Sequence, residues 1–121
     1  MGKQDRKAVR VALRLTAFMK FVSTGKVVRV LTKDISGLGM SLVTDGTLEL
    51  GTELELEITL PDRETPITCG AEVVWSKTTE ATHKSYEIPA SETGVRFVRI
   101  DPKEQAQLMQ YAQLNTFPDA P

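Results

Sequence analysis

The sequence predicts a mainly β fold, an antiparallel barrel or sandwich of about six strands followed by one α-helix. Three observations predict it. Apolar and polar residues alternate with a period of two in several short segments, turn residues separate these segments, and one helix-start signal stands near the C-terminus. With 121 residues, of which 40% are hydrophobic and 26% charged, the chain is long enough for one globular domain with its own core.

The strands follow from the alternation. Every second residue is apolar from 13 to 21, and from 53 to 60 leucine and isoleucine alternate with three glutamates and a threonine. One face of each strand should therefore be buried and the other solvated. Further strands are expected at 27–32, 40–43, 67–75 and 92–98, with turns at 23–26, 45–46 and 61–62 and a long loop over 77–91.

The helix has a clear start signal. Asp101 is the expected N-cap, Pro102 the first helical residue, and Glu104 stands where a capping box needs it. The helix should end near Asn115, and its apolar face should consist of Leu108, Tyr111 and Ala112.

The composition excludes several classes of function. Cys69 is the only cysteine and His83 the only histidine, so an internal disulfide, a Cys/His metal cluster and a base–nucleophile–orienter set cannot be assembled. No apolar run approaches the roughly 18 residues of a membrane span, and no signal peptide precedes the first basic residues. We therefore expect a cytoplasmic protein that is not inserted in a membrane and holds no metal.

Charge is unevenly distributed along the chain. Residues 1–33 contain nine Lys or Arg and one acidic residue, a net charge of +8, whereas the remainder contains six and fifteen, a net charge of −9. This asymmetry predicts a localised anion site. The alternative is that basic and acidic strands pair across a sheet.

A short motif, DISGLG at 34–39, follows the second expected strand. On an extended backbone Asp34 and Ser36 point to one face, and Ile35 and Leu38 are expected to point into the interior. A carboxylate and a hydroxyl at one strand end suit a ligand rich in N–H donors and hydroxyls. The alternative is a simple turn in which both side chains cap their own backbone.

Two glycines and two arginines extend this pattern. Gly37 and Gly39 permit a sharp turn, a positive φ or the close approach of a ligand. Upstream, Arg6 and Arg10 stand four residues apart, just before the first expected strand. An Arg-x-x-x-Arg segment followed some two dozen residues later by Asp-x-Ser-x-x-Gly resembles the PilZ family of bacterial cyclic-di-GMP receptors.

The resemblance covers nearly the whole chain, since Val-Val-Trp at 73–75 and Gly-Val-x-Phe at 94–97 resemble that family's late strands. It implies a six-stranded antiparallel β-barrel over 13–115 with its C-terminal α-helix. The residues themselves predict a flexible basic segment over 1–12, which lacks apolar periodicity, a tail over 116–121 and no catalytic residue. The resemblance also implies that the arginines lie on a loop that closes over cyclic-di-GMP, the only ligand, with no further cofactor. The implied binding residues are Arg6, Arg10, Asp34, Ser36 and Gly39, and Trp75 is either a stacking residue or a residue of the core or rim.

The chemistry of this ligand is consistent with the residues. The planar guanidinium of arginine matches both the O6/N7 edge of guanine and phosphate oxygens, and a carboxylate such as Asp34 accepts from guanine N–H groups. The sequence thus indicates a receptor that signals to an unidentified effector protein or by forming a homodimer. One alternative is a ligand-independent adaptor that docks onto motility or secretion machinery.

A second alternative is a small barrel that binds single-stranded nucleic acid. That class predicts aromatic residues interleaved with a basic face. The seven aromatic residues are not interleaved with the arginines, and the net charge is −1. No nucleic-acid partner is therefore expected.

Overall fold

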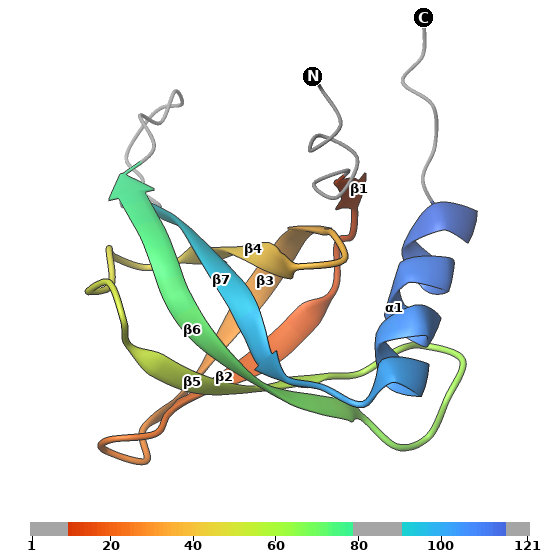
Figure 1. The fold of residues 1–121 in the computed structure, drawn as a ribbon, viewed down its shortest axis with the longest axis horizontal. Helices are drawn as coiled ribbons and strands as arrows, with labels where there is room; N and C mark the ends of the chain where they lie inside the picture. The colour runs from red at the N-terminus through yellow and green to blue at the C-terminus, as the bar shows by residue number, and fades with distance from the viewer. Residues whose placement is uncertain (1–9, 79–90, 116–121) are drawn as a thin grey trace, which may run out of the picture.

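The computed structural model describes residues 10–78 and 91–115, and within them the chain forms seven strands and one helix (Figure 1). These elements are β1 (Val11–Ala12), β2 (Thr16–Phe21), β3 (Val27–Ile35), β4 (Gly39–Thr44), β5 (Glu53–Ile58), β6 (Ile67–Thr78), β7 (Ser91–Arg99) and α1 (Pro102–Leu114).

Six of the strands close into a barrel. Neighbouring strands pair in the order β3, β2, β5, β6, β7, β4, and β4 pairs again with β3, every pair being antiparallel. The predicted six-stranded antiparallel β-barrel with a C-terminal helix is therefore confirmed. The two-residue strand β1 continues the line of β2 along β3, since Val11 and Ala12 pair with Ile35 and Asp34, beyond the part of β3 that pairs with β2.

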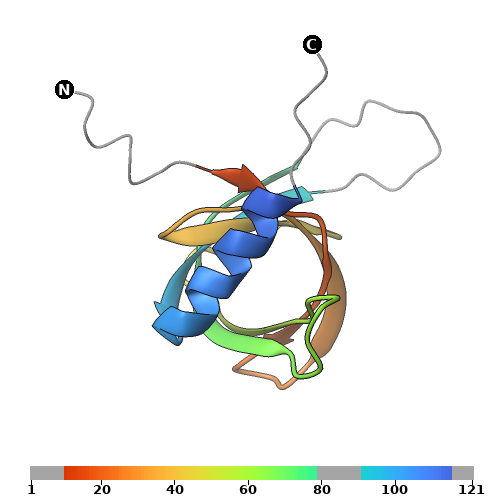
Figure 2. The ribbon, with the colours of Figure 1, turned by 90° about the vertical axis from the view of Figure 1, so that its right-hand side faces the viewer.

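The core lies inside this barrel and follows the predicted alternation. The inward faces of β2 and β5 are buried, as are Ile67 and Val73 of β6, while the glutamates of β5 are exposed. Helix α1 crosses one end of the barrel (Figure 2). Its own residues Leu108 and Ala112 are buried. The hydrophobic effect therefore holds the barrel and the helix together as one unit.

The helix begins and ends where its capping residues predict. The Asp101 carboxylate accepts a hydrogen bond from the backbone N–H of Lys103 at 2.8 Å, Pro102 opens the helix, and Asn115 is the C-cap. The expected capping-box role of Glu104 is not seen, because its carboxylate instead forms an ion pair with Arg63 at 3.3 Å. Helix α1 is too short and too polar to cross a membrane, and no other helix occurs in the described ranges.

Strand bounds differ from the prediction in both directions, since β2 begins only at Thr16 and β5 ends at Ile58, whereas β4 and β7 each extend one residue further at both ends. Strand β3 continues from the expected end at 32 to Ile35, and β6 continues to Thr78. The rest of the expected loop over 77–91 falls mostly on residues outside the described part, as do most of the basic segment over 1–12 and the tail over 116–121. Of the basic segment, residues 11–12 form β1.

Candidate ligand-binding site

The turn between β3 and β4 is built around Ser36. Its hydroxyl oxygen accepts hydrogen bonds from the backbone N–H groups of Leu38 at 3.2 Å and Gly39 at 3.3 Å, and its own N–H donates to the Gly39 carbonyl at 2.8 Å. Ser36 is 9% exposed. Its hydroxyl therefore caps its own turn, as the simpler interpretation of the motif expected, and holds the loop in one conformation.

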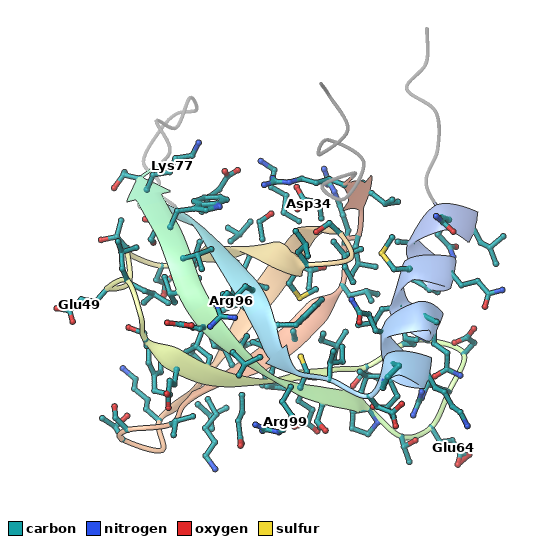
Figure 3. The ribbon with its side chains drawn as sticks, in the orientation of Figure 1. Asp34, Glu49, Glu64, Lys77, Arg96 and Arg99 are labelled. Atoms are coloured by element: carbon teal, nitrogen blue, oxygen red, sulfur yellow. The ribbon has the colours of Figure 1, made fainter. Side chains whose placement is uncertain are left out.

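Asp34 does not cap this turn. Its carboxylate (Asp34 is labelled in Figure 3) accepts a hydrogen bond from the Ser41 hydroxyl of β4 at 2.8 Å and lies 3.7 Å from a guanidinium nitrogen of Arg10. The side chain of Asp34 is 18% exposed and that of Arg10 is 53% exposed. The arginine segment and the DISGLG motif thus meet directly, through an ion pair with one exposed partner.

The two glycines of the motif have different surroundings. A Cβ atom built on Gly39 would overlap the carbonyl oxygen of Val95 and lie 2.8 Å from Cα of Arg96, both in β7. A Cβ atom on Gly37 would meet nothing within 4 Å. Among the described glycines only Gly25 and Gly51 have positive φ. The physical requirement at Gly39 is therefore the close approach of β4 to β7, and no left-handed backbone is involved.

One sequence expectation in this segment is wrong. Ile35 is fully buried as predicted, but Leu38 is 58% exposed. The period-two rule ends with the strand, because residues 36–38 form the turn. The Leu38 carbonyl accepts from the backbone N–H of Phe97 at 2.9 Å, which anchors the turn to β7 while its side chain faces outward.

The predicted residues from separate segments line one hollow of about 230 Å³ on the outer wall of the barrel. Arg10, Asp34, Ser36, Gly39 and Trp75 all contribute to it, whereas Arg6 lies outside the described residues.

Trp75 sits at the edge of this hollow. Its indole lies directly against Gly94 of β7, since a Cβ atom built there would overlap the ring. Lys77 holds its ammonium group 5.5 Å from the ring centroid on the same strand. Trp75 is half-buried, so it is a rim residue with a ring held in a defined orientation.

Arg96 is the residue that the sequence patterns did not single out. It is labelled in Figure 3 and lines the same hollow, and its Nε and Nη2 atoms donate to one carboxylate oxygen of Glu72 at 2.9 and 2.6 Å. In the sequence, Arg96 occupies only the variable position of Gly-Val-x-Phe. Its contact with Glu72 follows from the register of β6 and β7, which pairs these two residues. The ion pair holds a second guanidinium at the hollow in addition to Arg10.

Cys69, the one cysteine, is buried in the barrel. Burial raises the pKa of the Cys69 thiol to about 12, against the opposing effect of the positive charge of Arg99. The thiol is therefore protonated and unreactive near neutral pH. Within residues 10–78 and 91–115, no three His, Cys, Asp or Glu side chains are placed to hold a metal ion.

Comparison with known families gives a match over nearly the whole chain: the family model for the PilZ domain matches residues 4–114. The chain belongs to the PilZ domain family. No curated protein sequence matches it.

Solved structures share this PilZ fold. The PilZ domain of YcgR from Escherichia coli, solved with c-di-GMP (cyclic-di-GMP), has 16% identity and a TM-score of 0.70, with 88% of this chain and 87% of that chain covered. The Bacillus subtilis inhibitor of motility MotI has 25% identity and a TM-score of 0.64, with 88% and 50% covered. PlzA from Borreliella burgdorferi, solved with c-di-GMP, has 10% identity and a TM-score of 0.58, with 97% and 57% covered. The match to MotI and to PlzA spans only about half of each of those chains.

Proposed function

We propose that the protein is a cytoplasmic, non-enzymatic receptor for cyclic-di-GMP that signals to a partner protein. The observation that carries this proposal is the convergence of Arg10, Asp34, Ser36, Gly39 and Trp75 on one hollow. The choice of ligand is supported by membership of the PilZ family and by the cyclic-di-GMP complexes of the similar domains.

The groups around the hollow suit a guanine dinucleotide. Asp34 keeps acceptor capacity beyond its bond with Ser41, because an ionised carboxylate has about four lone-pair sites. It can therefore accept from guanine N–H groups. Arg10 and Arg96 present planar guanidinium groups that can pair with phosphate oxygens or with the O6/N7 edge of guanine. The ring of Trp75 offers a face on which a purine can stack.

The Arg10–Asp34 ion pair suggests how binding changes the protein. An arriving phosphate competes with the Asp34 carboxylate for Arg10, and at the same time guanine donors compete with Arg10 for Asp34. Ligand binding thus exchanges one exposed ion pair for several charge-assisted hydrogen bonds. Because Arg10 directly precedes β1, the loss of its ion pair with Asp34 changes the position of the N-terminal segment, and the barrel keeps its structure.

The size of the hollow supports the same closure. Its 230 Å³ is below the range of about 300–1,000 Å³ typical of small-molecule sites, so a cyclic dinucleotide would extend beyond the hollow that the described residues line. We propose that residues 1–9, which lie outside the described part and include Arg6, form the opposite wall around bound ligand.

A path from the site to the rest of the protein also exists. The side-chain amide of Gln105 in α1 donates to the carbonyl oxygen of Gly37 at 2.7 Å, and α1 contacts β1. Changes at the turn or in β1 therefore reach the helix directly. The signal would pass from there to an effector protein, or to a second copy if the output is a homodimer.

Isothermal calorimetry with cyclic-di-GMP, linear pGpG and GTP tests the proposal. Cyclic-di-GMP should bind and the other two should bind much more weakly, because neither presents two linked guanines in a fixed ring. A correctly folded protein that gives no binding heat with cyclic-di-GMP would refute the receptor and favour the ligand-independent adaptor.

Amide hydrogen exchange tests the closure separately. Addition of cyclic-di-GMP should increase protection in residues 3–12 and 34–39, with little change in β5, which lies away from the hollow. If ligand binds but protection in residues 3–12 is already high without it, the segment is a preformed wall and the closure mechanism fails.

A further inference from the structure

A second surface of the barrel has features that the proposed ligand site does not use. It consists of the outward side chains of β2 and β3 together with Arg14, which precedes β2, and Lys26 of the connecting turn, and is here called the hairpin face. Three large apolar side chains on it are exposed, Phe18 at 44%, Val27 at 53% and Leu31 at 53%. The register pairs Phe18 with Arg29, Lys20 with Val27 and Thr16 with Leu31, so that Phe18 has both aliphatic residues as diagonal neighbours.

The hairpin face is also strongly basic. Residues 14–33 contain five Lys or Arg and no acidic residue. Lys33 pairs with Glu92, but the other four cations form no ion pair with any described residue. These four are Arg14, Lys20, Lys26 and Arg29, and all are exposed. Every arginine of the described residues outside this face, in contrast, has an acidic partner.

The positively charged part of the hairpin face is narrow. On one side, Lys20 and Phe18 lie opposite Glu55 and Glu57 of β5, and adjacent strands are only about 4.8 Å apart. On the other side, Arg14 and Leu31 line a hollow of about 380 Å³ between β3 and the start of β7. The hairpin face therefore combines an apolar strip with positive charge, and the neighbouring strand β5 carries negative charge.

We propose that the hairpin face is a docking surface for an acidic, amphipathic segment of a partner protein. Such a segment can lay apolar side chains on the exposed strip while its carboxylates meet the four unpaired cations. The inference stands independently of cyclic-di-GMP binding, because none of the residues named on this face lines the ligand hollow.

Two other anionic partners fit the face less well. A lipid surface is broad and would approach the glutamates of β5 together with the cations, which opposes binding. Single-stranded nucleic acid needs aromatic rings for its bases, and Phe18 is the only aromatic residue among the exposed large hydrophobic residues of the described chain.

The test uses the full chain and a synthetic helix-forming peptide of Glu and Leu with leucines at i, i+3, i+4 and i+7, labelled for fluorescence anisotropy. Its control is the same peptide with every Glu replaced by Lys. At 0.15 M salt the acidic peptide should bind and the basic one should not. Backbone amide shifts in the presence of the acidic peptide should concentrate on β2 and β3.

Matched variants locate the contact. Arg29→Glu should weaken acidic-peptide binding by about tenfold or more, and Phe18→Ala, which keeps the charge, should weaken it severalfold. Lys103→Glu changes the net charge by the same amount as Arg29→Glu on an exposed residue of α1 and should have little effect. Thermal melting checks that each variant is folded.

Three results would overturn the proposal. The first is no binding of the acidic peptide to the parent protein. The second is equal loss in Arg29→Glu and Lys103→Glu, which means that only net charge matters. The third is tighter, Arg29-dependent binding to phosphatidylglycerol vesicles or to oligo-dT than to the peptide, which assigns the face to a membrane or to nucleic acid.

Discussion

Replacing Gly39 with alanine should destabilise the barrel far more than replacing Gly37, although both glycines stand in the same short turn. An added methyl group at Gly39 meets the backbone of β7 at Val95 and Arg96, and backbone cannot rotate away as a side chain can. At Gly37 the same methyl group meets open space. The contrast follows from the position of β7.

The size of the effect follows from the contacts. Forcing one extra methyl group into a packed site costs roughly 1–3 kcal/mol, and each backbone hydrogen bond weakened between the turn and β7 costs about 1 kcal/mol more. The Phe97–Leu38 hydrogen bond, at 2.9 Å, is one of these. Gly39→Ala should therefore lower the free energy of unfolding by about 2–4 kcal/mol, a shift in Tm of roughly 8–16 °C for a domain of this size.

Urea unfolding followed by the fluorescence of Trp75, the only tryptophan, measures this loss. Gly37→Ala is the matched control and should stay within about 0.5 kcal/mol of the parent protein. If Gly39→Ala is as stable as Gly37→Ala and loses only ligand binding, then Gly39 serves the approach of a ligand, and the packing argument is wrong.

Three further predictions concern the site and the core. Arg10→Ala should leave the fold intact and weaken cyclic-di-GMP binding, measured by calorimetry, by about ten- to more than a hundredfold, since a charge-assisted hydrogen bond contributes roughly 1.5–3 kcal/mol; unchanged affinity would remove Arg10 from the site. Asp34→Ala should reduce discrimination between cyclic-di-GMP and cyclic-di-AMP in competition, because the acceptor for guanine N–H groups is gone; equal discrimination would limit Asp34 to its structural contact with Ser41. Because the folded pKa of Cys69 is raised to about 12 from 9.0, its unfolded thiol ionises first, so the free energy of unfolding should fall between about pH 9 and 12 by up to about 1.4 kcal/mol per pH unit. Parallel unfolding curves of the parent protein and Cys69→Ala isolate this contribution, which is absent if both lose stability equally.

The candidate site was only partly predictable from sequence. The side chain of Asp34 and the turn at Ser36 were expected at a strand end, because both follow from local spacing. The placement of Arg10 and Asp34 in one site rested on family resemblance, since these residues lie 24 positions apart, and their ion pair appears only in the structure. Arg96 was missed, because its place at the hollow depends on the pairing of β7 with β4 and β6.

By itself, the sequence determined that six strands occur, which faces of β2 and β5 are buried, and both ends of the helix. These properties depend on neighbours within a few residues: a side chain alternates across a strand with period two, and a helix cap needs only Asp101 and the residues just after it. Only the tertiary structure decided that Gly39 must lack a side chain, that Leu38 faces outward, and that four cations of the β2–β3 hairpin remain unpaired. The reason is that each depends on which distant strand lies alongside and in which register, and closure of the barrel selects those partners.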